Sequence, residues 1–139
     1  MPSVIEVLKH DHREVEELFS RFESAEDPSI AEEICSELEV HTAAEEQIVY
    51  PALREAVTGG DKLADEAEQE HSQAKQIIGR IKRTTDAEHL GEVVGELKQA
   101  IEHHVEEEEG TVFPKMQSEV GATELEAMGT QVQEFKQSA

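Results

Sequence analysis

Two copies of one short motif, a histidine followed four residues later by a glutamate, carry the most specific chemistry in this sequence. His41 and Glu45 form the first copy, and His104 and Glu108 form the second. Residues four apart in an α-helix project from the same face, so each pair presents an imidazole beside a carboxylate. Imidazole nitrogen combined with carboxylate oxygen suits iron, manganese or zinc far better than calcium or magnesium. The motif therefore predicts metal binding.

The motifs belong to an internal repeat, HTAAEEQIVYP at residues 41–51 and HVEEEEGTVFP at residues 104–114, which align without a gap. One further histidine precedes each copy, His12 by 29 residues and His71 by 33. The chain therefore has two similar halves, and two equivalent halves predict two metal ions with the motif glutamates as bridges. The predicted metal ligands are His12, His41, Glu45, His71, His104 and Glu108.

Four long amphipathic segments must bring these residues together. Apolar residues recur along each segment in steps of three and four, the spacing of a helix with one buried face. Turn signals separate the segments at Ala25–Ser29, Thr58–Asp61 and Thr84–Asp86. Short links between four such helices predict an all-α, up-down antiparallel four-helix bundle. A shorter fifth segment, Glu124–Lys136, repeats the spacing, and we expect it to pack across the end of the bundle.

All six predicted ligands fall on the apolar stripes of these segments. An unpaired polar group costs about 2–7 kcal/mol when it is buried, so several of them would approach the stability of a typical domain, about 5–15 kcal/mol. Metal coordination offsets that cost, because it makes buried imidazoles and carboxylates favourable. Counted from the turns at about 1.5 Å per residue, the six side chains reach one layer midway along the bundle.

Composition limits the partners and the location. The sequence has 12 Lys and Arg against 33 Asp and Glu, a net charge of −21 at pH 7, which argues against nucleic acids and anionic membranes as partners. We expect a cytoplasmic protein, because no apolar run is long enough for a transmembrane helix or a signal peptide. The single cysteine, Cys35, is expected to pack as a small apolar residue. The chain length fits one domain, residues 1–139, as a monomer or weak oligomer.

On these residues the chain resembles the hemerythrin-like, or HHE cation-binding, domains over nearly its full length. It shows the H…HxxxE…H…HxxxE pattern of bacterial, notably mycobacterial, members. The segments that carry the resemblance are HDHR (10–13), HTAAEEQIVYP (41–51), EH (70–71) and HHVEEEEGTVFP (103–114). The resemblance implies a single hemerythrin-like domain around a non-haem di-iron centre, with two Fe ions per chain and an oxo or hydroxo bridge. It assigns the four histidines as terminal ligands and the two glutamates as bridges.

The sequence departs from the oxygen-carrying members of that family at two ligand positions. Their third helix supplies two histidines four residues apart, whereas Lys75 follows His71 at that spacing and Ala67 precedes it. Their final carboxylate is an aspartate five residues after its histidine, whereas Glu108 comes at four. The site is therefore one imidazole short, and the missing position is expected to be open, filled by water or taken by another oxygen ligand.

Tyr50, the only tyrosine, is the candidate for an extra ligand or for a contact to a ligand. It lies one turn beyond Glu45, and helical side chains lean toward the N-terminus, so its phenol can reach the metal layer. Phe113 holds the equivalent place in the second repeat, which favours a packing role for Tyr50 instead. Pro51 and Pro114 come next in each repeat and predict either a helix end or a kink.

The other acids and histidines around the motifs are expected to lie on solvated helix faces. They are Glu46, Glu106, Glu107, Glu109, His10, His89 and His103. On this interpretation nearly all of the 33 acids decorate the surface, and only the two motif glutamates lie in the core.

Three classes of function fit this centre. We favour an enzyme that disproportionates hydrogen peroxide to water and O2, as a catalase does, because an oxygen-rich and more open site favours ferric iron. The first alternative is reversible binding of O2 or NO, for carriage or sensing. The missing histidine disfavours carriage, and a chain without a signalling domain disfavours sensing. The second alternative is iron holding without turnover, which the lack of ferritin-type carboxylates disfavours. The expected small-molecule partners are H2O2, O2 and NO.

Overall fold

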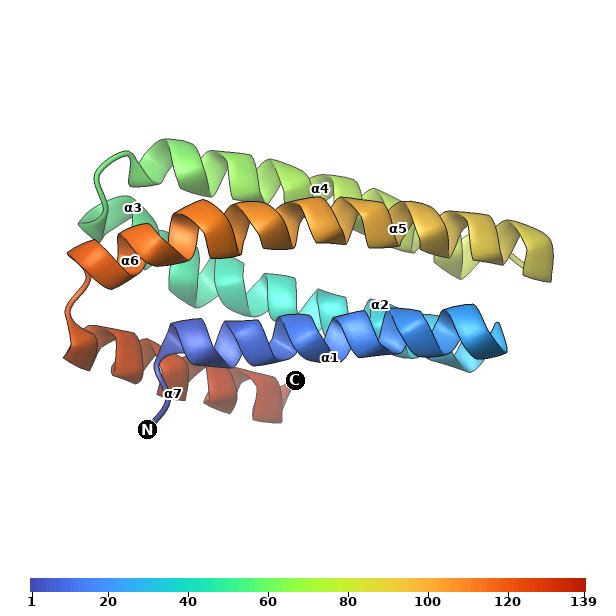
Figure 1. Ribbon diagram of the computed structural model, residues 1–139, viewed down its shortest axis with the longest axis horizontal. Coiled ribbons are helices and arrows are strands. Elements are labelled where there is room, and N and C mark those ends of the chain that lie inside the picture. Colours follow the sequence, from blue (N-terminus) through green and yellow to red (C-terminus); the bar gives the residue numbers. More distant parts are fainter.

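Helices form nearly all of the structure, a computed structural model that describes all 139 residues (Figure 1). The first and third long helices are α1 (Val4–Ala25) and α4 (Gly60–Arg83). The second comprises α2 (Pro28–Ala44), the π-helical turn η1 (Glu45–Val49) and α3 (Tyr50–Ala56). The fourth comprises α5 (Ala87–Glu107), the π-helical turn η2 (Glu108–Val112) and α6 (Phe113–Glu119), and the fifth is α7 (Ala122–Ser138).

The four long helices form the predicted antiparallel bundle, with α1 packed against α2 and α4 packed against α5 (Figure 1). The three turns lie where the sequence predicts them. Asp27 accepts a hydrogen bond from the amide of Ser29 at 2.9 Å and begins α2, and Asp86 accepts from the amide of His89 at 3.2 Å and begins α5. Gly59 takes a left-handed conformation, with φ of 74°, in the turn before α4. Each half of the chain is therefore a helix hairpin.

The fifth helix, α7, lies along α1 and α2 rather than across the end of the bundle, which corrects the expected position (Figure 1). Leu125, Met128 and Val132 bury their side chains in the core. Gly129 allows α7 to approach the start of α1 closely, since a Cβ atom there would lie 2.4 Å from the carbonyl oxygen of Pro2. The helix is thus packed firmly against the bundle.

Both motif glutamates begin a π-helical turn, a feature that the sequence does not reveal. The amide of Tyr50 donates to the carbonyl of Glu45, and the amide of Phe113 donates to that of Glu108, five residues back in each case. Proline follows each of these donors, and it cannot donate to the residue four back, whose carbonyl its ring would crowd. The wider π register relieves that conflict. The helices therefore continue past both prolines, as α3 and α6, rather than ending there.

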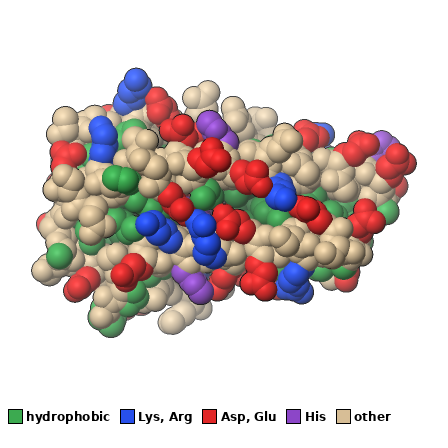
Figure 2. Space-filling model, in the orientation of Figure 1, with side chains coloured by type: hydrophobic (Ala, Val, Ile, Leu, Met, Phe, Trp, Pro, Cys, Tyr) green, Lys and Arg blue, Asp and Glu red, His purple; other side chains and the backbone are tan.

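A polar layer separates two apolar clusters of 18 buried residues each. One cluster fills the end of the bundle near α3, α6 and α7, and the other fills the end near the α1–α2 and α4–α5 turns. Cys35 is 2% exposed and packs in the second cluster, as predicted. Acidic side chains are spread over the visible surface (Figure 2). No helix combines the length and the apolar composition that a membrane span requires.

Candidate metal centre

The six predicted ligands meet in the polar layer, and none is more than 5% exposed. Their donor atoms form two groups, and within each group the atoms lie within 4.8 Å of one another. The first group contains His12, His41, Glu45 and Glu108, and the second contains Glu45, His71 and His104. The structure therefore brings together every residue that the sequence singles out, as two adjoining groups that could each hold a metal ion.

The motif glutamates lie between the two histidine pairs. Glu108 places Oε1 at 3.2 Å from Nε2 of His12 and Oε2 at 3.2 Å from Nε2 of His104. Glu45 places Oε1 at 3.3 Å from Nε2 of His41 and at 3.1 Å from Nε2 of His71. Each carboxylate thus faces both pairs, an arrangement that suits a bridge between two ions.

Tyr50 reaches the layer as well. Its hydroxyl donates to Oε2 of Glu108 at 2.7 Å, and it also lies 3.1 Å from Oε1 of Glu45 and 3.1 Å from Nε2 of His71. Its repeat partner Phe113 stacks on the ring of His12 instead, with centroids 5.9 Å apart and planes 8° apart. The expected packing role therefore describes Phe113, whereas Tyr50 adds an oxygen to the second group.

Four buried nitrogen and oxygen atoms of the layer make no hydrogen bond of good geometry, although Nε2 of His12 lies 3.2 Å from Oε1 of Glu108 and Nε2 of His41 lies 3.3 Å from Oε1 of Glu45. They are Nε2 of His12, Nε2 of His41, Oε2 of Glu45 and Oε1 of Glu108. All four residues belong to the first group. Each orphaned atom would cost free energy in an apolar core, whereas a metal ion would satisfy all of them. The residues present therefore fit a bound cation.

Within the layer, imidazoles and carboxylates stabilise each other's charged forms. Burial opposes protonation of His41, but the carboxylates of Glu45 and Asp11 outweigh it and raise the pKa of His41 to about 10. Burial also opposes ionisation of Glu45, but the surrounding imidazoles hold the pKa of that carboxyl well below its usual range. Without metal, the layer therefore contains imidazolium–carboxylate pairs, and a metal ion must displace protons from it.

An outer carboxylate contacts the second ring nitrogen of every histidine in the layer. Nδ1 of His12 lies 2.7 Å from Glu109, that of His41 lies 3.1 Å from Asp11, that of His71 lies 2.7 Å from Glu46, and that of His104 lies 2.7 Å from Glu70. Such contacts fix the tautomer and direct Nε2 of each ring toward a metal. The four outer carboxylates are thus part of the site.

Sequence reasoning missed these outer carboxylates. Glu46 and Glu109 were expected on a solvated face, and they are instead half-buried against the layer. Asp11, which is 4% exposed, corrects the expectation that only the two motif glutamates lie in the core, and Glu70 is partly buried as well. Each of the four directly precedes or follows a predicted ligand in the chain, but so does the exposed Glu107, so this signal was not selective. The other predicted surface residues are confirmed as exposed: Glu106, Glu107, His10, His89 and His103.

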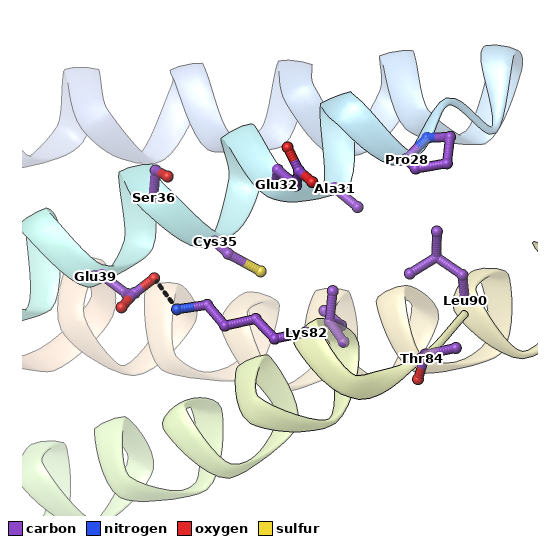
Figure 3. A pocket seen from close by; sticks show the side chains of 10 residues that line it. Pro28, Ala31, Glu32, Cys35, Ser36, Glu39, Lys82, Thr84 and Leu90 are labelled. Atoms are coloured by element: carbon purple, nitrogen blue, oxygen red, sulfur yellow. Dashed lines mark hydrogen bonds and ion pairs between the residues drawn. The ribbon is translucent and has the colours of Figure 1, made fainter. Parts of the chain in front are cut away.

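Of the two cavities described here, only the smaller one borders the layer. A cavity of about 430 Å³ lies beside Cys35 and the Glu39–Lys82 ion pair, between α2 and the end of α4, and no predicted ligand lines it (Figure 3). A much smaller cavity of about 20 Å³ borders His104 and Glu108, beneath Glu70. A space of about 10–15 Å³ is enough for one water molecule, so this cavity is large enough for a water-sized molecule.

Known proteins match both the sequence and the fold. The family model described as hemerythrin HHE cation binding domain matches residues 3–116. The crystal structure of an HHE cation-binding domain-containing protein from Mycobacterium kansasii matches with a TM-score of 0.82 and 25% identity, over 99% of this chain and 90% of that chain. A protein named DNA nickase from Nostoc sp. (strain PCC 7120) is 29% identical over 139 residues. That match covers 96% of this chain but only 38% of the curated relative.

Proposed function

Because this chain belongs to the family of hemerythrin HHE cation-binding domains, we propose that its buried layer holds two iron ions joined by an oxo or hydroxo bridge. One ion takes His12 and His41, the other takes His71 and His104, and the two motif glutamates lie between them. The position of Glu108 carries this proposal, because its two oxygens face one histidine of each pair. The four buried atoms of the first group that lack a hydrogen bond of good geometry also support it.

Tyr50 is the fifth protein ligand of the second ion in this proposal. Adjacent ligands of a six-coordinate ion with bonds of about 2.1 Å are about 3.0 Å apart. The phenol oxygen lies 2.7–3.1 Å from donor atoms of Glu108, Glu45 and His71, which supports that role. Lys75, where the oxygen carriers have a histidine, points its ammonium group at Glu46 at 3.2 Å. Tyrosine thus takes the place of the missing imidazole.

We propose that the loaded protein disproportionates hydrogen peroxide. Two H2O2 molecules become two H2O and one O2, and the iron pair supplies and recovers the two electrons exchanged between them. Protein donors are fewer on the side of His12 and His41, where Phe113 contributes an apolar ring instead of an oxygen. An ion held there would therefore keep an open coordination position for a small substrate. The outer carboxylates hold the imidazoles in position, and the two apolar clusters keep bulk water away.

Reversible binding of O2 or NO is the second candidate, and iron holding without turnover is the third. A phenol and two carboxylates are hard oxygen donors that stabilise the ferric state, whereas reversible O2 binding needs a stable ferrous state. The donor set therefore favours peroxide chemistry over oxygen carriage. We further propose that the protein works in the cytoplasm as a monomer or weak oligomer.

Mixing iron-loaded protein with hydrogen peroxide, in a stopped-flow instrument and in an oxygen electrode, tests the proposal. Release of one O2 for every two peroxide molecules, over many turnovers, supports the enzyme. Bleaching by one equivalent of peroxide without O2 release rules it out. A new absorption band that forms when O2 is added to the reduced protein and disappears when O2 is removed favours reversible binding. Protein carrying Glu108→Ala, treated identically, controls for free iron.

We propose that nucleic acids are not partners of this chain, although one relative is named a DNA nickase. The net charge is −21, and DNA binding requires cations that neutralise phosphates. The match covers 38% of that relative, so most of its length has no counterpart here.

A further inference from the structure

The four outer carboxylates differ in their access to water. The side chains of Glu46, Glu70 and Glu109 are 22–30% exposed, so water solvates part of each charge. Asp11 is only 4% exposed, although its Oδ2 accepts a hydrogen bond from Nδ1 of His41 at 3.1 Å. An ionised carboxylate removed from water is costly unless a cation compensates it. The other three also have a basic neighbour, Lys75 for Glu46, His103 for Glu70 and Arg13 for Glu109, but Asp11, which water does not solvate, depends most on a cationic partner.

That partner comes from the fifth helix. Nζ of Lys136 donates to Oδ1 of Asp11, the oxygen that His41 leaves free. The side chain of Lys136 is itself 27% exposed, so it links the buried carboxylate to the surface. Lys136, Asp11 and His41 thus form a chain of contacts from α7 to the layer, which we call the relay.

We infer that Lys136 is a positioning residue for the ion bound by His12 and His41. By pairing with Asp11 it keeps that carboxylate as the acceptor for Nδ1 of His41, and so it holds Nε2 of the ring toward the metal. The inference rests on the proposed metal centre, which it deepens. It gives α7 a role in the site, although α7 lies beyond residues 3–116 that the family model matches.

The anchoring of α7 on α1 holds Lys136 near Asp11. The close approach of Gly129 to the backbone of Pro2 and Ser3 fixes the helix against the start of α1. Asp11 lies on α1 itself, two turns further along. The packing of α7 on α1 therefore places the backbone of Lys136 within side-chain reach of Asp11.

Calorimetric titration of the metal-free full-length protein with Co²⁺ tests the inference. Outer contacts of this kind typically contribute 10- to 100-fold in metal affinity. We expect Lys136→Met to weaken one of two Co²⁺ equivalents by about 10- to 100-fold and to leave the other unchanged. Lys136→Arg should restore the affinity. The matched control is Lys75→Met, because its partner Glu46 is 30% exposed and stays solvated, so both equivalents should keep their affinity.

Combining Lys136→Met with His41→Ala tests whether Lys136 acts through His41. If Lys136 acts through His41, adding Lys136→Met to His41→Ala should weaken Co²⁺ binding no further. The inference is overturned if Lys136→Met binds both Co²⁺ equivalents with wild-type affinity. It is also overturned if the variant loses affinity equally for both equivalents and has a lower melting temperature, because that result indicates a general loss of structure. A wild-type protein that binds no Co²⁺ would overturn the proposed metal centre as well. If the wild type binds two Co²⁺ ions and Lys136→Met binds both with unchanged affinity, only the inference about Lys136 is overturned.

Discussion

The hydroxyl of Tyr50 lies 2.7 Å from Oε2 of Glu108, 58 residues away in the chain. The two residues come from different copies of the internal repeat, and each copy begins a π-helical turn at its glutamate. Phe113 occupies the equivalent place in the second copy and has no oxygen to offer. A symmetric pair of helix hairpins therefore encloses an asymmetric site, with the phenol on the side of His71 and His104.

Tyr50→Phe should change the visible spectrum of the iron-loaded protein. A phenolate bound to ferric iron gives a charge-transfer band, so the wild type should be coloured and the variant should lose that band. Iron affinity should also fall by about tenfold or more. Phe113→Leu is the control, because it changes the matching position without touching an oxygen, and it should keep the band. A Tyr50→Phe protein with the wild-type spectrum would mean that the hydroxyl only hydrogen-bonds to ligands.

Glu108→Ala should leave the protein unable to hold two irons. Its carboxylate is the group whose oxygens face both histidine pairs, so its loss removes a donor from each ion. Elemental analysis after iron loading should give about two irons per chain for the wild type and far fewer for the variant, an expectation from the shared-ligand geometry. Glu107→Ala is the matched control, since Glu107 is the exposed neighbour on the same helix. Equal iron in all three proteins would refute the ligand assignment.

The bundle and the six inner residues could be predicted because both depend on periodicity. Steps of three and four put His41 and Glu45 on one helix face, and a repeat reveals which of many acids matter. The π-helical turns leave no such trace, because the spacing from His41 to Glu45 is the same in either helix type. The position of α7 was also missed, since an amphipathic segment shows that it is buried but not against which surface.

The periodicity of the sequence could not distinguish the four outer carboxylates from the other acids. In a chain with 33 acids, Glu46 and Glu107 look alike, and both lie beside motif residues. What separates them is the helix that each one faces. Glu46 faces α4 and reaches Nδ1 of His71, whereas Glu107 faces solvent. That distinction depends on how the helices pack together.

Metal affinity should rise with pH. His41, with its pKa raised to about 10 in the metal-free protein, is protonated at neutral pH, yet it must be neutral to bind a metal. Binding should therefore release protons, which calorimetry in two buffers of different ionisation enthalpy detects. The proton on His41 opposes metal binding, but it stabilises the folded protein when no metal is bound. Because the folded pKa exceeds the ordinary 6.5, its contribution to stability is complete below pH 6.5 and disappears as the pH rises through about 10.

Thermal unfolding completes that test. The melting temperature of the metal-free protein should fall between pH 6.5 and pH 10, the ordinary and the raised pKa of His41. His10→Gln, which alters an exposed histidine, should show the same fall, because His10 lies outside the layer. Metal binding without proton release would contradict the expected protonation of the layer.

DNA should stay intact in the presence of this protein. A domain with a net charge of −21 repels the phosphate backbone, and the cavity beside the layer, about 20 Å³, is far too small for a phosphodiester group. Supercoiled plasmid incubated with iron- or manganese-loaded protein at low salt should therefore remain supercoiled on an agarose gel. Glu108→Ala protein, prepared identically, shows the background from contaminating nucleases. Conversion to nicked circles by the manganese-loaded wild type alone, where oxidative cleavage by iron cannot occur, would assign a phosphodiesterase activity to the metal centre and would overturn the exclusion of nucleic acids.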